Sequence, residues 1–187
     1  MFMKYESVNT PSELLEFMNE KISYGYIGKN KKKYLFNDSN FNSDWFDNYI
    51  LEKPREVLSN KVGNCYDQVE LERNWFIKHN YEIKTFYIMV EVNYVNNYPT
   101  HVFLVFKENN GWNLFESADY INRGIFKFGS INELIDNQFK KQIQLIKSID
   151  SNFNCLDKIH VYEYNKPKYN INAKEFIDYC INAKRVK

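Results

Sequence analysis

The change of hydrophobic period near residue 81 constrains this chain more than any other feature of its sequence. Before it, apolar residues recur at helical spacing, whereas residues 81–94 are rich in β-branched and aromatic side chains and predict a long strand. Residues 101–106 are apolar on both faces, which is typical of a central strand. Residues 109–111 predict a hairpin turn, and residues 112–115 the strand that returns from it. The middle of the chain is therefore expected to form an antiparallel sheet.

Helices are expected before and after these strands. Thr10, Pro11 and Glu13 form a capping signal for a helix that runs to about residue 22, and Ser130 with Glu133 predicts a second capping box. Further helices are predicted over residues 44–51, 54–58, 65–79, 130–147 and from residue 172 onward. Turns or loops are expected at residues 23–28, 29–33 and 37–43, and further strands at residues 125–128 and 157–164. This order predicts a single α+β domain over residues 1–187, with helices packed on an antiparallel sheet.

Composition excludes several classes of protein. The chain has 187 residues, among them 15 Tyr, 15 Phe and 3 Trp, which is enough apolar surface for one packed domain. Its net charge of +1 provides no attraction to nucleic acid or acidic lipid, and no apolar stretch has the length of a membrane span. We therefore expect a soluble cytoplasmic protein with no nucleic-acid or membrane partner, while its oligomeric state stays open.

Cys65 is the first candidate for chemistry. Gly63 and Asn64 break the chain just before the helix predicted over residues 65–79, so that Cys65 falls in its first turn. Free backbone N–H groups and the positive end of the helix dipole favour a thiolate there. The alternative is a small hydrophobic residue packed at a helix start. Because the three cysteines have no metal-type spacing, neither a disulfide framework nor a metal site is expected.

A nucleophilic cysteine needs a base, and the chain has three histidines. His79 lies 14 positions further along the same helix, or roughly 21 Å at about 1.5 Å per residue, which is out of reach. His160 alternates with apolar residues and is more simply a half-exposed strand histidine. His101 opens the most apolar strand; it is either a satisfied core residue or, at the strand end where active sites collect, a base. By elimination His101 is the preferred base.

The third group depends on the register of the predicted hairpin. A four-residue loop over residues 108–111 pairs Lys107 with Trp112. Glu116 is then the diagonal neighbour of His101 on the same face, within reach of a long side chain.

Other turns give other partners. A three-residue loop shifts the pairing by one position, so that Asp119 faces His101 and Glu116 points away. A two-residue turn at Asn110 and Gly111 keeps Glu116 on the right face but too far along the strand. Glu116 is preferred, because a carboxylate on a buried face needs a partner, although an exposed edge-strand glutamate stays possible.

Four features together carry a resemblance to a known family. Residues 63–67 (GNCYD) at a helix start, preceded by residues 54–58, look like the G-x-C-x-D segment of the transglutaminase-like superfamily of papain-like cysteine enzymes. His101 opens a strand of the type that carries that family's histidine, and Trp112 precedes Glu116 by four residues, as in its W-x-x-x-D motif. The order of cysteine, histidine and acid is also the family's. The resemblance covers about a third of the chain and departs from the family, which usually has Asp, at Glu116.

The resemblance implies a papain-like fold and a role for each residue. Cys65 would be the nucleophile, His101 its imidazolium partner and the acid for the leaving group, and Glu116 the group that orients the imidazole. The Cys65 backbone N–H would be one oxyanion donor. The expected substrate-binding residues are Tyr24, Tyr26, Asp67 and Gln68, and a second donor would come from one of the two tyrosines or from Gln68. The two tyrosines could equally be core aromatics, and Asp67 a favourable charge in the first helical turn.

The expected activity is acyl transfer through a thioester, without cofactor or metal. Its substrate would be a peptide, a protein or a small amide, and hydrolysis is favoured over transamidation because the chain leaves little room for accessory domains. One alternative is an inactive fold that acts as a binding module. Another, an arylamine-type acetyltransferase, fits less well because Asn64 is not preceded by an Arg-Gly-Gly run.

Overall fold

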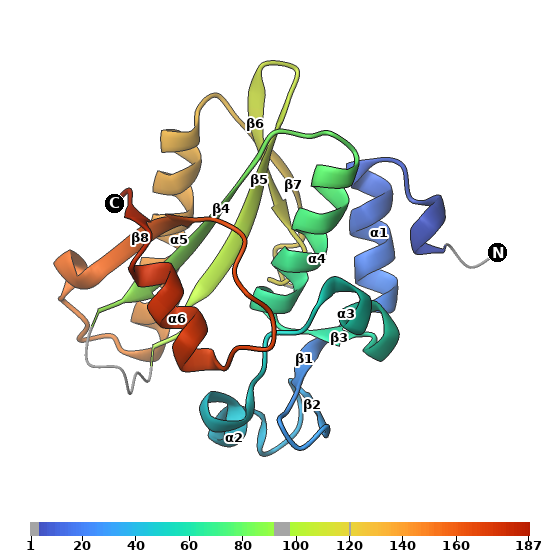
Figure 1. Cartoon of the computed structure of the whole chain (residues 1–187). Coiled ribbons are helices and arrows are strands. Elements are labelled where there is room, and N and C mark those ends of the chain that lie inside the picture. Colours follow the sequence, from blue (N-terminus) through green and yellow to red (C-terminus); the bar gives the residue numbers. More distant parts are fainter. Residues whose placement is uncertain (1–3, 92–97, 120) are drawn as a thin grey trace.

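A six-stranded antiparallel sheet is the largest element of the fold (Figure 1). The computed structural model describes residues 4–91, 98–119 and 121–187, with the backbone alone for residues 42–44. The strand order is β7-β6-β5-β4-β8-β9. The strands are β4 (Ile83–Val90), β5 (His101–Glu108), β6 (Gly111–Glu116), β7 (Gly124–Phe128), β8 (Ile159–Tyr164) and β9 (Lys184–Arg185). The expected α+β class and antiparallel pairing are confirmed, whereas β9 was not predicted.

Helices cover both faces of this sheet. They are α1 (Pro11–Lys21), α2 (Phe41–Asn48), α3 (Pro54–Asn60), α4 (Cys65–Lys78), α5 (Ile131–Ile149) and α6 (Ala173–Ile181), with two short 3-10 helices at Tyr5–Ser7 and Leu156–Lys158. In Figure 1, α5 lies on one face of the sheet and α1, α4 and α6 on the other. No helix in the described part of the chain is long and apolar enough to cross a membrane.

Successive residues of the central strands alternate between two hydrophobic cores. Phe103 and Val105 of β5 belong to the same core as Leu134 of α5. Val102 and Leu104, which point to the opposite face, belong to the core that includes α1, α4 and α6. This two-sided burial explains why β5 is apolar at every position from Val102 to Phe106.

A second, three-stranded sheet was missed by the sequence analysis. It consists of β1 (Ser23–Ile27) between β2 (Lys33–Leu35) and β3 (Val62–Gly63), and β1 pairs in parallel with β3. The expected turn at residues 23–28 is thus mostly strand, and the helix placed at residues 44–51 begins earlier, at Phe41. A parallel partner 39 positions away (Ser23 with Val62) gives no local signal. β3 leads directly into α4, so this small sheet positions the candidate nucleophile.

Helix starts were predicted well because capping is local. The capping box of Thr10 and Glu13 is present at α1. Ser130 accepts from the Glu133 N–H as expected, but the Glu133 carboxylate reaches back to the N–H of Gly129 rather than of Ser130. The strand predicted over residues 81–94 begins at Ile83, and its predicted end lies at residues 92–94, outside the described residues.

The hairpin between β5 and β6 has the preferred register. Lys107 pairs with Trp112, as predicted, and Glu108 with Gly111. The turn itself has only two residues, Asn109 and Asn110, at φ 50° and 62°, while Gly111 already belongs to β6. Asparagine tolerates the left-handed conformation that this turn requires, so the glycine is free to begin the strand.

The burial of α4 differs from an amphipathic pattern. The charged residues Glu70, Glu72 and Arg73 are 0%, 1% and 6% exposed, whereas the apolar Ile77 is 55% exposed. The helix is enclosed because it contacts α3 and β3 as well as β4 and β5 of the large sheet. Its polar residues therefore have to find partners inside the protein.

Candidate active site

Cys65 is the first residue of α4 and follows β3 through Asn64. The Asn64 side-chain oxygen accepts from the backbone N–H groups of Tyr66 (3.0 Å) and Asp67 (3.3 Å), and Asp67 accepts in return from the Asn64 N–H (3.2 Å). This reciprocal capping box leaves the Cys65 N–H and thiol at the positive end of the helix. The position predicted for Cys65 is confirmed, and the residue is 5% exposed.

Gly63 allows β3 to pass close to this first turn. A Cβ at position 63 would lie 2.9 Å from the Cβ of Asp67 and 3.3 Å from Val57 Cγ1. Any side chain would push the strand away from α3 and α4. Glycine is thus required by close packing just before the cysteine.

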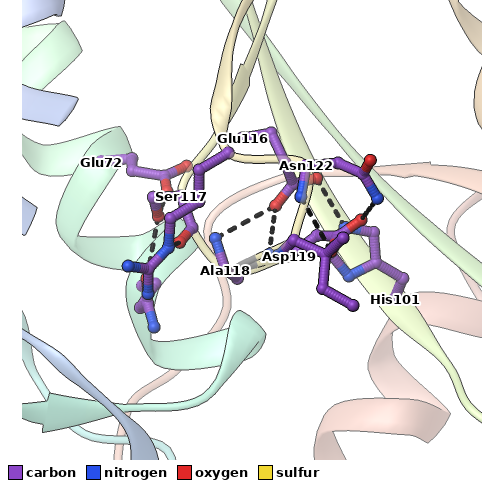
Figure 2. A network of polar contacts seen from close by, with 10 residues as sticks. Glu72, His101, Glu116, Ser117, Ala118, Asp119 and Asn122 are labelled. Atoms are coloured by element: carbon purple, nitrogen blue, oxygen red, sulfur yellow. Dashed lines mark hydrogen bonds and ion pairs between the residues drawn. The ribbon is translucent and has the colours of Figure 1, made fainter. Parts of the chain in front are cut away.

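His101 and Glu116 meet across the hairpin, as Figure 2 shows. The His101 Nε2 and Glu116 Oε2 atoms are 2.8 Å apart. The other carboxylate oxygen, Oε1, accepts from the backbone N–H groups of Ala118 (3.1 Å) and Asp119 (2.9 Å). Glu116 is 3% exposed, so the three contacts hold a buried carboxylate in one orientation.

Asp119, the other candidate partner of His101, is used within its own turn. Its Oδ1 accepts from the N–H groups of Ile121 and Asn122, and its Oδ2 from the Asn122 side chain. The choice between Glu116 and Asp119 that the hairpin register left open is thereby decided in favour of Glu116 as the neighbour of His101.

The environment of His101 favours its protonated form. Burial lowers the pKa of His101, but the charge of Glu116 and hydrogen bonds to Cys65 and Glu116 raise it, and the net pKa lies well above the usual value. Since Glu116 occupies Nε2, the ring nitrogen left for the thiol is Nδ1. The structure thus brings Cys65, His101 and Glu116 together, and the His101 side chain stays 21% exposed.

Tyr24, one of the two tyrosines expected near the site, contacts Cys65. Tyr24 pairs with Gly63 between β1 and β3. The pKa of Tyr24 lies well above its usual value, mainly because the residue is buried. The charge of Cys65 and a hydrogen bond to the Cys65 side chain raise the pKa of Tyr24 further, whereas a hydrogen bond from the Cys65 backbone lowers it. Tyr26, two residues along β1, is fully buried; it stacks on Tyr34 and donates to the Phe41 carbonyl (3.4 Å).

Asp67 and Gln68 face the protein interior. Asp67 accepts from the Tyr49 hydroxyl (2.9 Å) and the Glu52 N–H (3.0 Å). Burial raises its pKa to about 8, although these bonds oppose the shift. The Gln68 amide donates to the Gly63 carbonyl (2.8 Å), and its oxygen accepts from Ser117 (2.9 Å). These contacts favour a structural role for both residues, and their contact with substrate stays a prediction.

A pocket of about 540 Å³ adjoins His101 and Tyr24. Much of its lining is apolar, and the polar side chains in it include Thr100, Gln138 and Gln142. A second hollow of about 380 Å³ shares the Tyr24 wall. Such volumes suit a small molecule or a few residues of a peptide.

The other two histidines have their own contacts. His79, at the end of α4, stacks on Trp75 with ring centroids 3.9 Å apart. His160 was expected to be half-exposed, but it is 3% exposed, with Nε2 2.8 Å from Glu91 Oε2. The expectation was wrong because β8 is an interior strand, between β4 and β9.

Two residues of the site region were missed. Glu72 of α4 lies 2.5 Å from the Ser117 hydroxyl, directly after Glu116. The signal was available, because positions 65, 68 and 72 share one helical face. A glutamate on the face of the candidate nucleophile indicates a buried polar contact.

Comparison with protein-family models and with curated proteins finds no match for this chain. Within residues 4–91, 98–119 and 121–187, no three or more His, Cys, Asp or Glu side chains gather in a way that would hold a metal ion.

Proposed function

We propose that this protein is a cysteine-dependent acyl-transfer enzyme of transglutaminase-like type, which acts on amide or ester carbonyls through Cys65. One observation carries the proposal: His101 lies between Glu116, at 2.8 Å, and the Cys65 thiol, and its pKa is raised by both partners against the effect of burial. A cysteine at a helix start beside a charged imidazole meets the requirements of an activated thiol nucleophile.

The first half-reaction forms a thioester. The Cys65 thiolate attacks the carbonyl carbon, a C–S bond forms, and the carbonyl π electrons move to oxygen. The Cys65 backbone N–H donates to this oxyanion, and the neighbouring Tyr24 hydroxyl supplies a second donor. The intermediate then collapses, the bond to the leaving nitrogen or oxygen breaks, and the leaving group takes the proton of the imidazolium.

The second half-reaction releases the acyl group. Neutral His101 takes a proton from water, the resulting hydroxide attacks the thioester, and the C–S bond breaks to give a carboxylic acid and the thiolate. An amine in place of water would give transamidation. We favour hydrolysis of a peptide, a protein segment or a small amide, because the adjoining pocket is largely apolar and carries neutral amide and hydroxyl groups beside its few charged residues.

The longer side chain of Glu116 is compatible with the role of the family's aspartate. The backbone N–H groups of Ala118 and Asp119 hold its carboxylate against His101, so the extra methylene does not leave it mobile. The placement of Cys65 at a helix start and of His101 and Glu116 on adjacent antiparallel strands supports the resemblance to the transglutaminase-like superfamily.

The proposal is tested by the pH dependence of cysteine alkylation with iodoacetamide, followed for each cysteine by peptide mass spectrometry. An ordinary thiol titrates near about pH 8.5. We expect Cys65 to react well below this pH in the wild type and to lose that advantage in His101→Ala. Exposed Cys155 is the internal reference in both proteins.

If Cys65 follows an ordinary thiol profile, or stays inert, in both proteins, the catalytic proposal is wrong. The alternative, a binding module on the same fold, would then be favoured. In that case Cys65→Ala should leave its biochemical function intact.

A further inference from the structure

Glu72, Ser117, Gln68 and Gly63 form a chain of close polar contacts inside the protein (Figure 2 shows Glu72 and Ser117). Glu72 Oε1 lies 2.5 Å from Ser117 Oγ, which lies 2.9 Å from Gln68 Oε1; Gln68 Nε2 in turn lies 2.8 Å from the Gly63 carbonyl. Each of the three side chains is 1% exposed. Among the described residues, Glu72 Oε2 has no hydrogen-bond partner.

The hydrogens available to these groups fix which group donates and which accepts in each contact. The Gly63 carbonyl only accepts, so the Gln68 amide nitrogen must face it and the amide oxygen must face Ser117. The single hydroxyl hydrogen of Ser117 is then needed for Gln68. The 2.5 Å contact between Ser117 and Glu72 therefore contains a hydrogen only if Glu72 supplies it.

The opposite assignment leaves two defects. If Ser117 donates to an ionised Glu72, the oxygens of Ser117 and Gln68 face each other at 2.9 Å without a hydrogen between them. A buried carboxylate charge would also keep one oxygen, Oε2, without a partner. Both defects are costly in the protein interior. A neutral carboxylic acid removes the first defect, and it removes the charge from the second, so that Oε2 becomes an uncharged carbonyl oxygen.

We propose that Glu72 is a positioning residue of the candidate site, held as the neutral acid, whose proton starts a directed chain Glu72 → Ser117 → Gln68 → Gly63. This series of hydrogen bonds joins the two segments that carry the reacting groups, because Ser117 follows Glu116 and Gly63 precedes Cys65 by two residues. Its role in positioning rests on the function proposed above, whereas the protonation of Glu72 does not.

The surroundings of Glu72 agree with a neutral acid. Burial raises the pKa of Glu72 well above its usual value; the hydrogen bond with Ser117 and the charge of His101 lower it, and the charges of Glu116 and Glu70 raise it. A neutral Glu72 also leaves Glu116 as the carboxylate that pairs with His101.

Two substitutions of equal length separate the proton from the rest of the side chain. Glu72→Gln keeps a donor for Ser117 through its amide nitrogen, whereas Glu72→Met fills the same space without a donor. Glu82→Met, at an exposed carboxylate, is the matched control for the loss of a glutamate. The readout is the rate of Cys65 alkylation by iodoacetamide between pH 5 and 9, with circular dichroism to verify folding.

We expect Cys65 in Glu72→Gln and in Glu82→Met to be alkylated at the wild-type rate. In Glu72→Met the alkylation rate at pH 6 should be lower by about tenfold, because small displacements of reacting groups are costly. Ser117→Ala should lower the alkylation rate as much as Glu72→Met does. The double variant that combines Glu72→Met with Ser117→Ala should react no more slowly than either single variant, because both remove the same interaction. Equal rates in Glu72→Gln and Glu72→Met, whether both fast or both slow, would overturn the positioning role.

A second measurement works even if Cys65 is an ordinary thiol. The side-chain carboxyl ¹³C resonance of Glu72, assigned by its absence in Glu72→Gln, is followed from pH 4 to 9 in the intact protein. We expect the protonated form to persist through neutral pH. Titration near the ordinary glutamate value of about 4.3 would overturn the assignment of the proton. Failure of the proposed function and failure of this inference are thereby distinguishable.

Discussion

Glu116 contacts His101 with one carboxylate oxygen and two backbone N–H groups with the other. In Glu116→Gln the amide nitrogen, which only donates, has to face either the protonated His101 Nε2 or the backbone N–H groups of Ala118 and Asp119. The charge that raises the His101 pKa is also lost. We expect Cys65 alkylation by iodoacetamide at pH 6 to fall at least about tenfold, by analogy with the loss of the acid in other triads.

Glu108→Gln, at the exposed end of the same hairpin, is the control for this experiment and should leave the rate unchanged. Glu116→Asp retains the charge on a shorter side chain, so its alkylation rate should lie between those of Glu116→Gln and Glu108→Gln. A Glu116→Gln profile identical to the wild type would show that the carboxylate does not support the imidazolium.

Tyr24 and Tyr26 differ in what their hydroxyl groups contact, so they form a matched pair of variants. If the Tyr24 hydroxyl stabilises the oxyanion, Tyr24→Phe should slow hydrolysis of 4-nitrophenyl acetate by about 10²-fold or more, as for other oxyanion donors. Alkylation by iodoacetamide, which forms no oxyanion, should change much less. Tyr26→Phe, whose hydroxyl donates to Phe41, should leave both rates unchanged. Equal losses in the two reactions would instead indicate that Tyr24 acts on the thiol.

At the scale of elements, the junction of β3 and α4 is closely packed around Gly63. Gly63→Ala places a Cβ 2.9 Å from the Asp67 Cβ, and neither backbone can give way without moving Cys65. We expect a loss of about 1–3 kcal/mol in the free energy of unfolding, measured by urea denaturation.

Gly129→Ala is the control for this prediction. Its Cβ would approach only the flexible end of Glu133, at 3.3 Å, so we expect a much smaller change in the unfolding free energy. Equal costs at the two positions would show that packing against α4 does not set the cost at Gly63.

At the scale of the whole molecule, buried acids and His101 act on stability in the same direction. Burial raises the pKa of Asp67 to about 8 and of Glu70 to about 7, in the latter case against the charge of Arg73. The folded protein therefore binds more protons than the unfolded chain between the ordinary acid range and these values. The raised pKa of His101 adds stability that is complete below its unfolded value of about 6.5 and is lost as pH rises through the folded one.

We therefore expect the free energy of unfolding to fall as pH rises from 5 to 8, as measured by urea denaturation at several pH values. Most proteins instead lose stability as the pH falls, because the fold stabilises the ionised form of their carboxylates. Asp67→Asn should reduce the fall, since it removes one of the groups responsible. A stability that rises over this range would show that these carboxyl groups are ionised in the folded protein.

Local signals were sufficient for much of this protein. Capping residues placed the starts of α1 and α5, and the break at Gly63 and Asn64 placed the start of α4. The change of period separated the helices from the strands. The hairpin register, which follows from a few neighbouring residues, put Glu116 within reach of His101. These features could be predicted because each depends on residues close together in the chain.

Contacts between distant segments decided the rest. The pairing of Ser23 with Val62 creates the small sheet that brings Tyr24 to Cys65, and no pattern within either segment announces it. The enclosure of α4 buries Glu70, Glu72 and Arg73, charged residues that a helix on the surface would expose to solvent. Burial is a property of everything that surrounds a residue, so the protonation of Glu72 and the charge of His101 depend on the assembled fold.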